Sequence, residues 1–147
     1  MVADEMCVTI QKEVGDRMTA GPGSGDYGVL SIIMSATGEA TVLRKLKPSV
    51  FWPAPQVDSV MVKFIRNEEK VSRIHDMEFF RETVNLFMGH RRKMMQACVK
   101  FADGKLKDVT GWGDIFERSF VDPHARGENV DANAYISIAN LCYEQLR

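Results

Sequence analysis

The chain has 147 residues, of which 45% are hydrophobic, so it can bury one ordinary core, or a small core plus part of another. No apolar run approaches the roughly 18–20 residues of a membrane span, and the first residues, with Asp4 and Glu5, lack the basic region of a signal peptide. We therefore expect a globular, cytoplasmic protein without a membrane partner.

The net charge of -1 conceals a basic middle section. Residues 44–107 hold 14 Lys or Arg against 7 Asp or Glu, so this section has a net charge of about +7, while both flanks are acidic. Segregated positive charge suits a phosphate-binding surface, because binding releases counterions from the nucleic acid. A solvated helix face explains the same pattern equally well, and charge alone leaves both readings open.

Cysteine and histidine side chains offer no framework for a disulfide or a metal ion. They are few and widely separated, and no HExxH or other ligand spacing occurs among them. We predict reduced cysteines and no metal site. These residues are Cys7, Cys98, Cys142, His75, His90 and His124.

The first third of the chain alternates between regular elements and loops. A short β-branched run at residues 6–10 predicts a strand that leads directly into a helix over residues 11–19. Residues 20–28 (AGPGSGDYG) predict a loop, since glycine and proline punctuate them. The apolar residues 29–37 fit either a buried helix or a strand, and periodicity does not decide between them.

Two strands and a set of helices follow. Alternation of apolar and polar residues predicts strands over residues 39–46 and 57–65, paired antiparallel across a proline-containing turn. Asp76 is a good N-cap for a long helix. Arg91 falls within its apolar stripe, so either the helix ends near Gly89, which we favour, or Arg91 has an anionic partner. Shorter patterns predict helices over residues 114–119 and 131–146.

Three segments are candidates for chemistry. Residues 20–25 (AGPGSG) superficially resemble a phosphate-binding loop, but no GK[ST] or GxGxxG pattern follows, which makes a plain loop the better interpretation. In residues 51–55 (FWPAP), prolines stiffen a turn that carries two aromatic rings, which suits base stacking, although the rings of such a turn more often cover a core. Residues 90–93 (HRRK) gather cations beside the expected helix end, where they can bind a polyanion or simply favour the helix dipole.

Taken together and in order, segments along nearly the whole chain resemble the C-terminal region of the small-subunit rRNA adenine N6,N6-dimethyltransferases. This family consists of S-adenosylmethionine-dependent enzymes. The matching segments are residues 11–14 with Arg17, residues 20–24, 27–31 and 51–59, Phe87 with Arg91, Arg92 and Lys93, and Arg126 with Glu128, Asn129 and Tyr135.

The resemblance implies a role for each of the candidate segments. Phe51 is expected to be the catalytic-site residue that stacks on the target adenine, with Pro53 and Pro55 fixing its turn. Arg91, Arg92 and Lys93, together with the strand lysines, are expected to bind the rRNA of an immature 30S-type subunit. These lysines, which lie in or next to the two expected strands, are Lys45, Lys47 and Lys63.

The chain also departs from the family pattern. It contains neither the glycine-rich cofactor loop after a first strand nor an Asn-Leu-Pro-Tyr-like catalytic segment. Smaller departures are Ala54, where the family often has proline, and Gly127, where it usually has alanine. The resemblance therefore implies that S-adenosylmethionine binds the full-length enzyme, and that this segment alone binds no cofactor and is inactive.

The fold class that we expect is α/β. Residues 1–66 would be the C-terminal remnant of a doubly wound class I methyltransferase sheet, with about three strands, and residues 67–147 a small all-α rRNA-recognition domain. Residues 6–10 would be an interior parallel strand of the full sheet, so that its bare edge favours self-association of the segment. The alternatives are a non-catalytic helical RNA- or ribosome-binding module and the recognition part of a related methyltransferase for another RNA.

Overall fold

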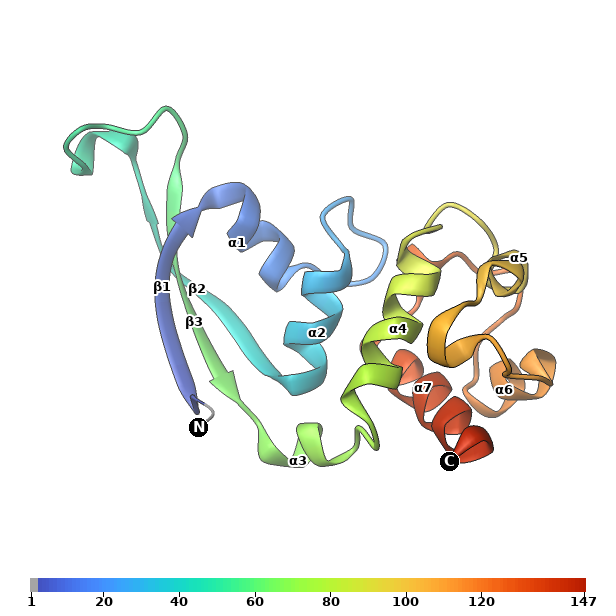
Figure 1. The fold of residues 1–147 in the computed structure, drawn as a ribbon. Helices are drawn as coiled ribbons and strands as arrows, with labels where there is room; N and C mark the ends of the chain where they lie inside the picture. Colours follow the sequence, from blue (N-terminus) through green and yellow to red (C-terminus); the bar gives the residue numbers. More distant parts are fainter. Residues whose placement is uncertain (1–2) are drawn as a thin grey trace.

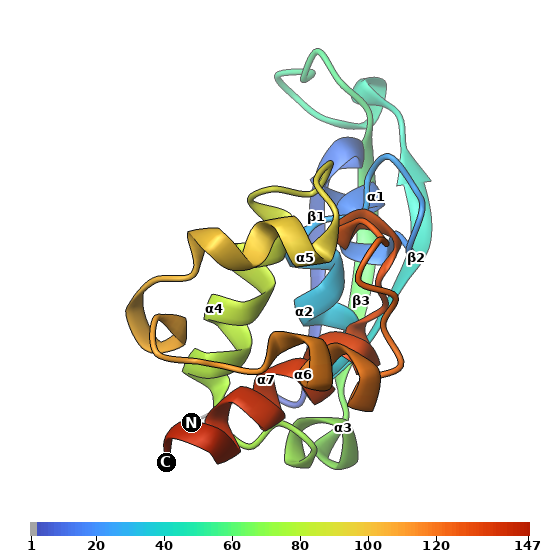
Figure 2. The same ribbon diagram turned by 90° about the vertical axis from the view of Figure 1, so that its right-hand side faces the viewer.

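The computed structural model describes residues 3–147, which form a small sheet, two helices on one of its faces, and a helical region beyond them (Figure 1). Figure 2 shows the helical region from the front, with the sheet behind it. The longer elements are β1 (Glu5–Gln11), α1 (Lys12–Thr19), α2 (Val29–Thr37), β2 (Gly38–Leu46), β3 (Ser59–Arg66), α4 (Met77–Met88), α6 (Trp112–Arg118) and α7 (Ala132–Leu146). The shorter ones are α3 (Glu68–Ser72), α5 (Met95–Cys98) and the 3-10 turns η1 (Pro48–Val50), η2 (Val99–Phe101), η3 (Gly104–Leu106) and η4 (Gly127–Asn129).

The sheet has the order β1-β3-β2, and both pairs of strands are antiparallel. Val60 and Val62 on the central strand point to the face covered by α1 and α2, where they are buried with Met18. β2 has a bulge between Val42 and Arg44. The two expected strands and their antiparallel pairing are confirmed, although β3 begins at Ser59 instead of residue 57.

β1 is an edge strand of the described sheet. It pairs with β3 on one side, and within residues 3–147 no strand pairs with its other side. The opposite face of the sheet, which carries the exposed Cys7, Thr9 and Ile65, has no helix over it in this part of the chain (Figure 1). The parallel neighbour expected for residues 6–10 is therefore not among these residues, and the strand's position inside a larger sheet stays a prediction.

α2 lies between the sheet and the helical region (Figure 1). Leu30 and Met34 pack on the sheet-side core, whereas Ile32 and Ala36 are buried in the larger core with the helices. A helix with two buried faces has apolar residues all round, which explains why periodicity could not distinguish it from a strand. The larger core crosses residue 66, and the domain boundary there stays a prediction.

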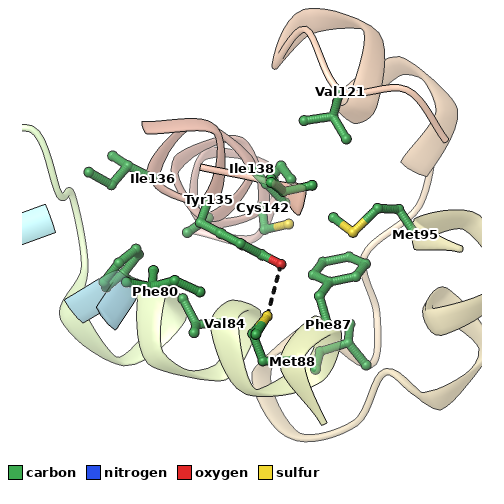
Figure 3. Close-up of a cluster of buried hydrophobic side chains, with 14 of the residues drawn as sticks. Phe80, Val84, Phe87, Met88, Met95, Val121, Tyr135, Ile136, Ile138 and Cys142 are labelled. Atoms are coloured by element: carbon green, nitrogen blue, oxygen red, sulfur yellow. Dashed lines mark hydrogen bonds between the residues drawn. The ribbon is translucent and has the colours of Figure 1, made fainter. Parts of the chain in front are cut away.

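The larger core is centred on the contact between α4 and α7. Phe80, Val84 and Phe87 of α4 meet Tyr135 and Ile138 of α7, and all five are fully buried (Figure 3). The Tyr135 hydroxyl donates to the carbonyl oxygen of Gly127 at 2.8 Å and contacts the sulfur of Met88 at 3.5 Å. Its buried polar atom is thus satisfied, as burial without a large penalty requires.

The helix ends follow capping rules. The Asp76 carboxylate accepts the N–H of Phe79 at 2.9 Å, so the expected N-cap of α4 is confirmed. α4 ends at Met88 with Gly89 as its C-cap, where the sequence favoured a break. α6 ends in a Schellman motif, because Val121 N–H donates to Phe116 O at 2.9 Å and Phe120 takes the left-handed conformation (φ 56°).

Candidate nucleic-acid interface

The proline-containing turn, which we call the elbow (residues 47–58), projects from the end of the sheet at which β1 terminates (Figure 1). The N–H of Lys12, just past the end of β1, donates to the carbonyl oxygen of Asp58 at 2.9 Å. A hollow of about 330 Å³ lies between the two segments, lined by Gln11, Lys12, Glu13, Gln56, Val57 and Asp58. In open α/β sheets, ligands bind outside the carboxyl ends of parallel strands. The carboxyl end of β1 lies here, and its place as a parallel strand of a larger sheet stays a prediction.

The elbow carries two aromatic rings with different surroundings. Phe51 is partly buried and belongs to neither hydrophobic core, and its N–H donates to Pro48 O at 3.2 Å. Trp52 is 96% exposed. The sequence pointed to Phe51 alone as the stacking ring, whereas in the structure Trp52 is the more exposed of the two rings. Pro53 is exposed and Pro55 is partly buried.

Cations surround the base of the elbow. Lys45 and Lys47 are exposed, and within residues 3–147 neither forms an ion pair; Arg44 beside them is likewise exposed and without an acidic partner there. Lys63, by contrast, is 3.0 Å from a carboxylate oxygen of Glu5 on the neighbouring strand. Of these three lysines, Lys63 is thus paired with a carboxylate, whereas Lys45 and Lys47 have no ion-pair partner within residues 3–147.

The basic segment after α4, residues 90–93, likewise contains both paired and unpaired cations among the described residues. Arg91 Nε lies 3.5 Å from Glu128 Oε2, and both side chains are only about one-third exposed (33% and 27%). The sequence posed a helix end and an anionic partner as alternatives for Arg91, and the structure has both. Arg92 and Lys93 are exposed, and no carboxylate pairs with them in the described part of the chain.

The elbow and the basic segment lie in different parts of the molecule. The elbow extends beyond the sheet, whereas residues 90–93 follow α4 in the helical region, with α1 and α2 between them (Figure 1).

The glycine-rich loop is fixed to the helical region. Gly23 N–H donates to the Glu128 carbonyl oxygen at 2.8 Å, and the buried Tyr27 hydroxyl donates to Val130 O at 2.7 Å. Burial raises the pKa of Tyr27 well above its ordinary value, with a smaller contribution from the charge of Asp131. This loop follows a helix and not a strand, and its backbone is engaged in packing, so it does not fit a cofactor-phosphate loop.

The family of ribosomal RNA adenine dimethylases matches residues 1–143. The chain belongs to this family. Among curated relatives, ribosomal RNA small subunit methyltransferase A of Caldanaerobacter subterraneus subsp. tengcongensis is 32% identical over 139 residues, which are 95% of this chain and 51% of the relative. The same-named protein of Alkaliphilus oremlandii is 37% identical over 142 residues, covering 96% and 49%. The chain thus spans about half the length of the curated relatives it matches.

Two solved methyltransferase structures share the fold of this chain. A dimethyladenosine transferase from Plasmodium falciparum superposes with a TM-score of 0.77 at 22% identity, over 92% of this chain and 55% of that one. The 23S rRNA methyltransferase ErmE gives a TM-score of 0.59 at 18% identity, over 93% and 54%. The predicted family and the predicted α/β fold of methyltransferase type are confirmed.

No group of three or more His, Cys, Asp or Glu side chains is arranged to hold a metal ion among residues 3–147. In the same residues, no helix combines the length and apolar character needed to cross a bilayer.

Proposed function

We propose that this chain is the target-base-holding and rRNA-docking part of an S-adenosylmethionine-dependent rRNA adenine N6,N6-dimethyltransferase that acts on immature 30S-type subunits. The observation that carries the proposal is the position of the elbow, in a member of this family, at the carboxyl end of β1. An aromatic ring held there meets a base at the edge where an α/β sheet binds its ligands.

In this proposal Phe51 stacks on the adenine after the base has left its helix. An enzyme that modifies a base must hold it outside the stack, and stacking on an aromatic ring contributes about 1–3 kcal/mol per base. Pro53 and Pro55 reduce the conformational freedom of the elbow, so less entropy is lost when the base binds. Trp52, with its ring almost fully exposed, is available to the neighbouring nucleotide.

Cations on two sides of the molecule hold the rRNA. Lys45 and Lys47 bind phosphates near the target base, while Arg92 and Lys93 bind a second region of the RNA. Lys63, which pairs with Glu5, adds positive charge to the first of these two regions. Arg91 contributes to this side mainly by holding Glu128. The separation of the elbow from the basic segment favours a large folded RNA over a short single strand as the substrate.

The cofactor supplies the methyl group when it is bound. The glycine-rich loop does not fit it, since this loop follows a helix and is hydrogen-bonded to Glu128 and Val130. S-adenosylmethionine therefore binds to other parts of the full-length enzyme, and this segment by itself has no methyltransferase activity.

The test is methyl transfer to small-subunit rRNA by the protein that contains this chain. Phe51→Ala is expected to lower kcat at least tenfold while the Kd for rRNA changes less than threefold, because the ring acts on a base already docked. Lys45→Gln with Lys47→Gln is expected to raise Kd and reduce its salt dependence by a slope of about one per lysine. Equal turnover of Phe51→Ala and the parent would remove Phe51 from the site, and rRNA binding without any methyl transfer by the parent would favour a non-catalytic RNA-binding module.

A further inference from the structure

A second aromatic surface, remote from the elbow, lies where α4 gives way to the short helices. The rings of His90 and Phe101 are stacked with centroids 4.1 Å apart and an angle of 18° between their planes. Phe101 is 40% exposed and belongs to neither hydrophobic core. The Phe101 ring thus has one face against the imidazole of His90, and part of its surface remains exposed to solvent.

Two lysines flank the stacked pair. Lys100 Nζ lies 5.2 Å and Lys93 Nζ 5.9 Å from the centroid of the Phe101 ring, within the range of cation–π contacts. Neither lysine forms an ion pair within residues 3–147. Arg92, also exposed, precedes Lys93. The Phe101 ring is thus in contact with two ammonium groups that pair with no carboxylate in the described part of the chain.

A hollow of about 340 Å³ adjoins the pair and is lined by Glu82, Asn85, Leu86, His90, Phe101 and Asp103. One of its carboxylates is already used, because Glu82 accepts the N–H of Lys105 at 2.8 Å. Both carboxylates repel a phosphate. A nucleotide at this place must therefore direct its phosphate to the lysine side and only its uncharged base to the ring and the hollow.

We propose that His90, Phe101, Lys93 and Lys100 form a binding site for one unpaired nucleotide of the RNA, which we call the Phe101 site. The base stacks on the face of Phe101 that His90 does not cover, and the two lysines turn from the ring to the phosphate, as their flexible side chains allow. This site rests on the proposed rRNA-binding function and adds to it a single-stranded contact on the helical region.

The experiment measures the binding of an adenine oligoribonucleotide that carries one fluorescent 2-aminopurine, and of small-subunit rRNA, to the protein that contains this chain. Phe101→Leu, which removes the ring but keeps an apolar side chain, is expected to weaken oligonucleotide binding about tenfold and to abolish the quenching caused by stacking. Phe101→Tyr keeps a ring and is expected to bind as the parent does. Lys93→Gln and Lys100→Gln are each expected to reduce the salt slope by about one.

The matched control is Phe120→Leu, since Phe120 is 97% exposed in the same helical region and is expected to leave binding unchanged within twofold. Thermal denaturation of each variant verifies that it is folded. If Phe101→Leu binds the oligonucleotide and quenches its fluorescence as the parent does, the Phe101 site is overturned. The proposed function is unaffected by that result as long as the parent binds and methylates rRNA. Absence of rRNA binding by the parent would instead contradict the proposed function.

Discussion

The backbone N–H of Gly23 donates to the backbone carbonyl of Glu128 at 2.8 Å, which ties the glycine-rich loop to a residue more than a hundred positions later in the chain. The side chain of the same Glu128 lies 3.5 Å from Arg91 and 3.9 Å from Arg126. Glu128 therefore joins its own segment to two others, and one of these, with Arg91, carries residues that the sequence suggested for RNA binding.

Arg91 and Arg92 are adjacent in sequence but are expected to respond differently to the same substitution. Arg91→Gln weakens the partly buried pair with Glu128 and is expected to lower the free energy of unfolding by about 0.5–1 kcal/mol, whereas Arg92→Gln leaves it unchanged. Arg92→Gln is expected to weaken rRNA binding and to reduce its salt slope by about one. Urea denaturation and RNA titrations at several salt concentrations measure both effects, and identical stability of the two variants would contradict the structural role of Arg91.

Gly15 permits α1 to pack closely on β3. A Cβ at this position would overlap Val60 Cγ2 and lie 3.4 Å from Val62 Cγ2, both on buried side chains. Gly15→Ala is expected to lower the free energy of unfolding by about 1–2 kcal/mol, because overpacking exceeds the gain of about 1 kcal/mol in helix propensity.

The matched control is Gly113→Ala in α6, where nothing lies within 4 Å of the added Cβ and only the propensity gain remains. Thermal or urea denaturation distinguishes the two variants. A Gly15→Ala variant as stable as Gly113→Ala would show that α1 moves away from the sheet at little cost.

Phe120 combines a left-handed backbone with a side chain that contacts almost nothing (φ 56°, 97% exposed). Left-handed geometry costs a residue with a Cβ about 1–2 kcal/mol, whereas glycine adopts it freely. The larger entropy that glycine loses on folding offsets part of this gain. Phe120→Gly is therefore expected to raise the free energy of unfolding by about 0.5–1 kcal/mol. Phe120→Ala keeps the unfavourable backbone and is expected to be close to neutral, so equal stabilisation by both substitutions would point to the exposed ring as the cause.

Alkaline pH is expected to destabilise the fold through three buried groups. Burial raises the pKa of the Cys142 thiol from 9.0 to about 12, and burial likewise raises the pKa values of Tyr27 and Tyr135 above the ordinary 10.0. The folded state favours the neutral form of each group, so their contribution to stability is complete below pH 9 and is lost as pH rises from 9 toward 12 and above.

Denaturation curves over this pH range measure the loss, and tyrosinate absorbance reports the ionisation. We expect Tyr27 and Tyr135 to ionise only as the protein unfolds, and Cys142→Ala to flatten the pH dependence at the lower end of the range. Tyrosinate formation by all tyrosines at ordinary pKa values in a folded protein would contradict the burial of these hydroxyls.

The free edge of β1 predicts self-association of this segment when it is produced alone. Unpaired strand edges recruit other strands, and the face that carries Cys7, Thr9 and Ile65 has no helix over it in residues 3–147. Size-exclusion chromatography is expected to show dimers or larger species at micromolar concentration. A compact monomer that resists heating would contradict this expectation.

Local patterns were sufficient to predict most elements, because alternation, capping and glycine or proline positions act over a few residues. The Asp76 cap, the end of α4 at Met88 and the antiparallel strands follow from such signals. Periodicity alone left residues 29–37 undecided between helix and strand, since α2 is apolar on two faces that meet different cores, and only the family resemblance favoured a helix there.

The candidate site was less accessible to sequence reasoning. That the elbow is near the end of β1, that Arg91 reaches Glu128 and that Phe101 stacks on His90 are all contacts between positions separated along the chain. A positive segment such as residues 90–93 indicates where charge is available. It does not show which of its members the folded protein has already paired.

The position of α2 between two cores has a consequence for how this family can diverge. A substitution on one side of the helix alters its contact with the sheet, and one on the other side alters its contact with the helices, while the same backbone serves both. Recombination that exchanged the helical region for another module would have to preserve half of α2 and redesign the other half, which makes this junction a poor site for domain shuffling.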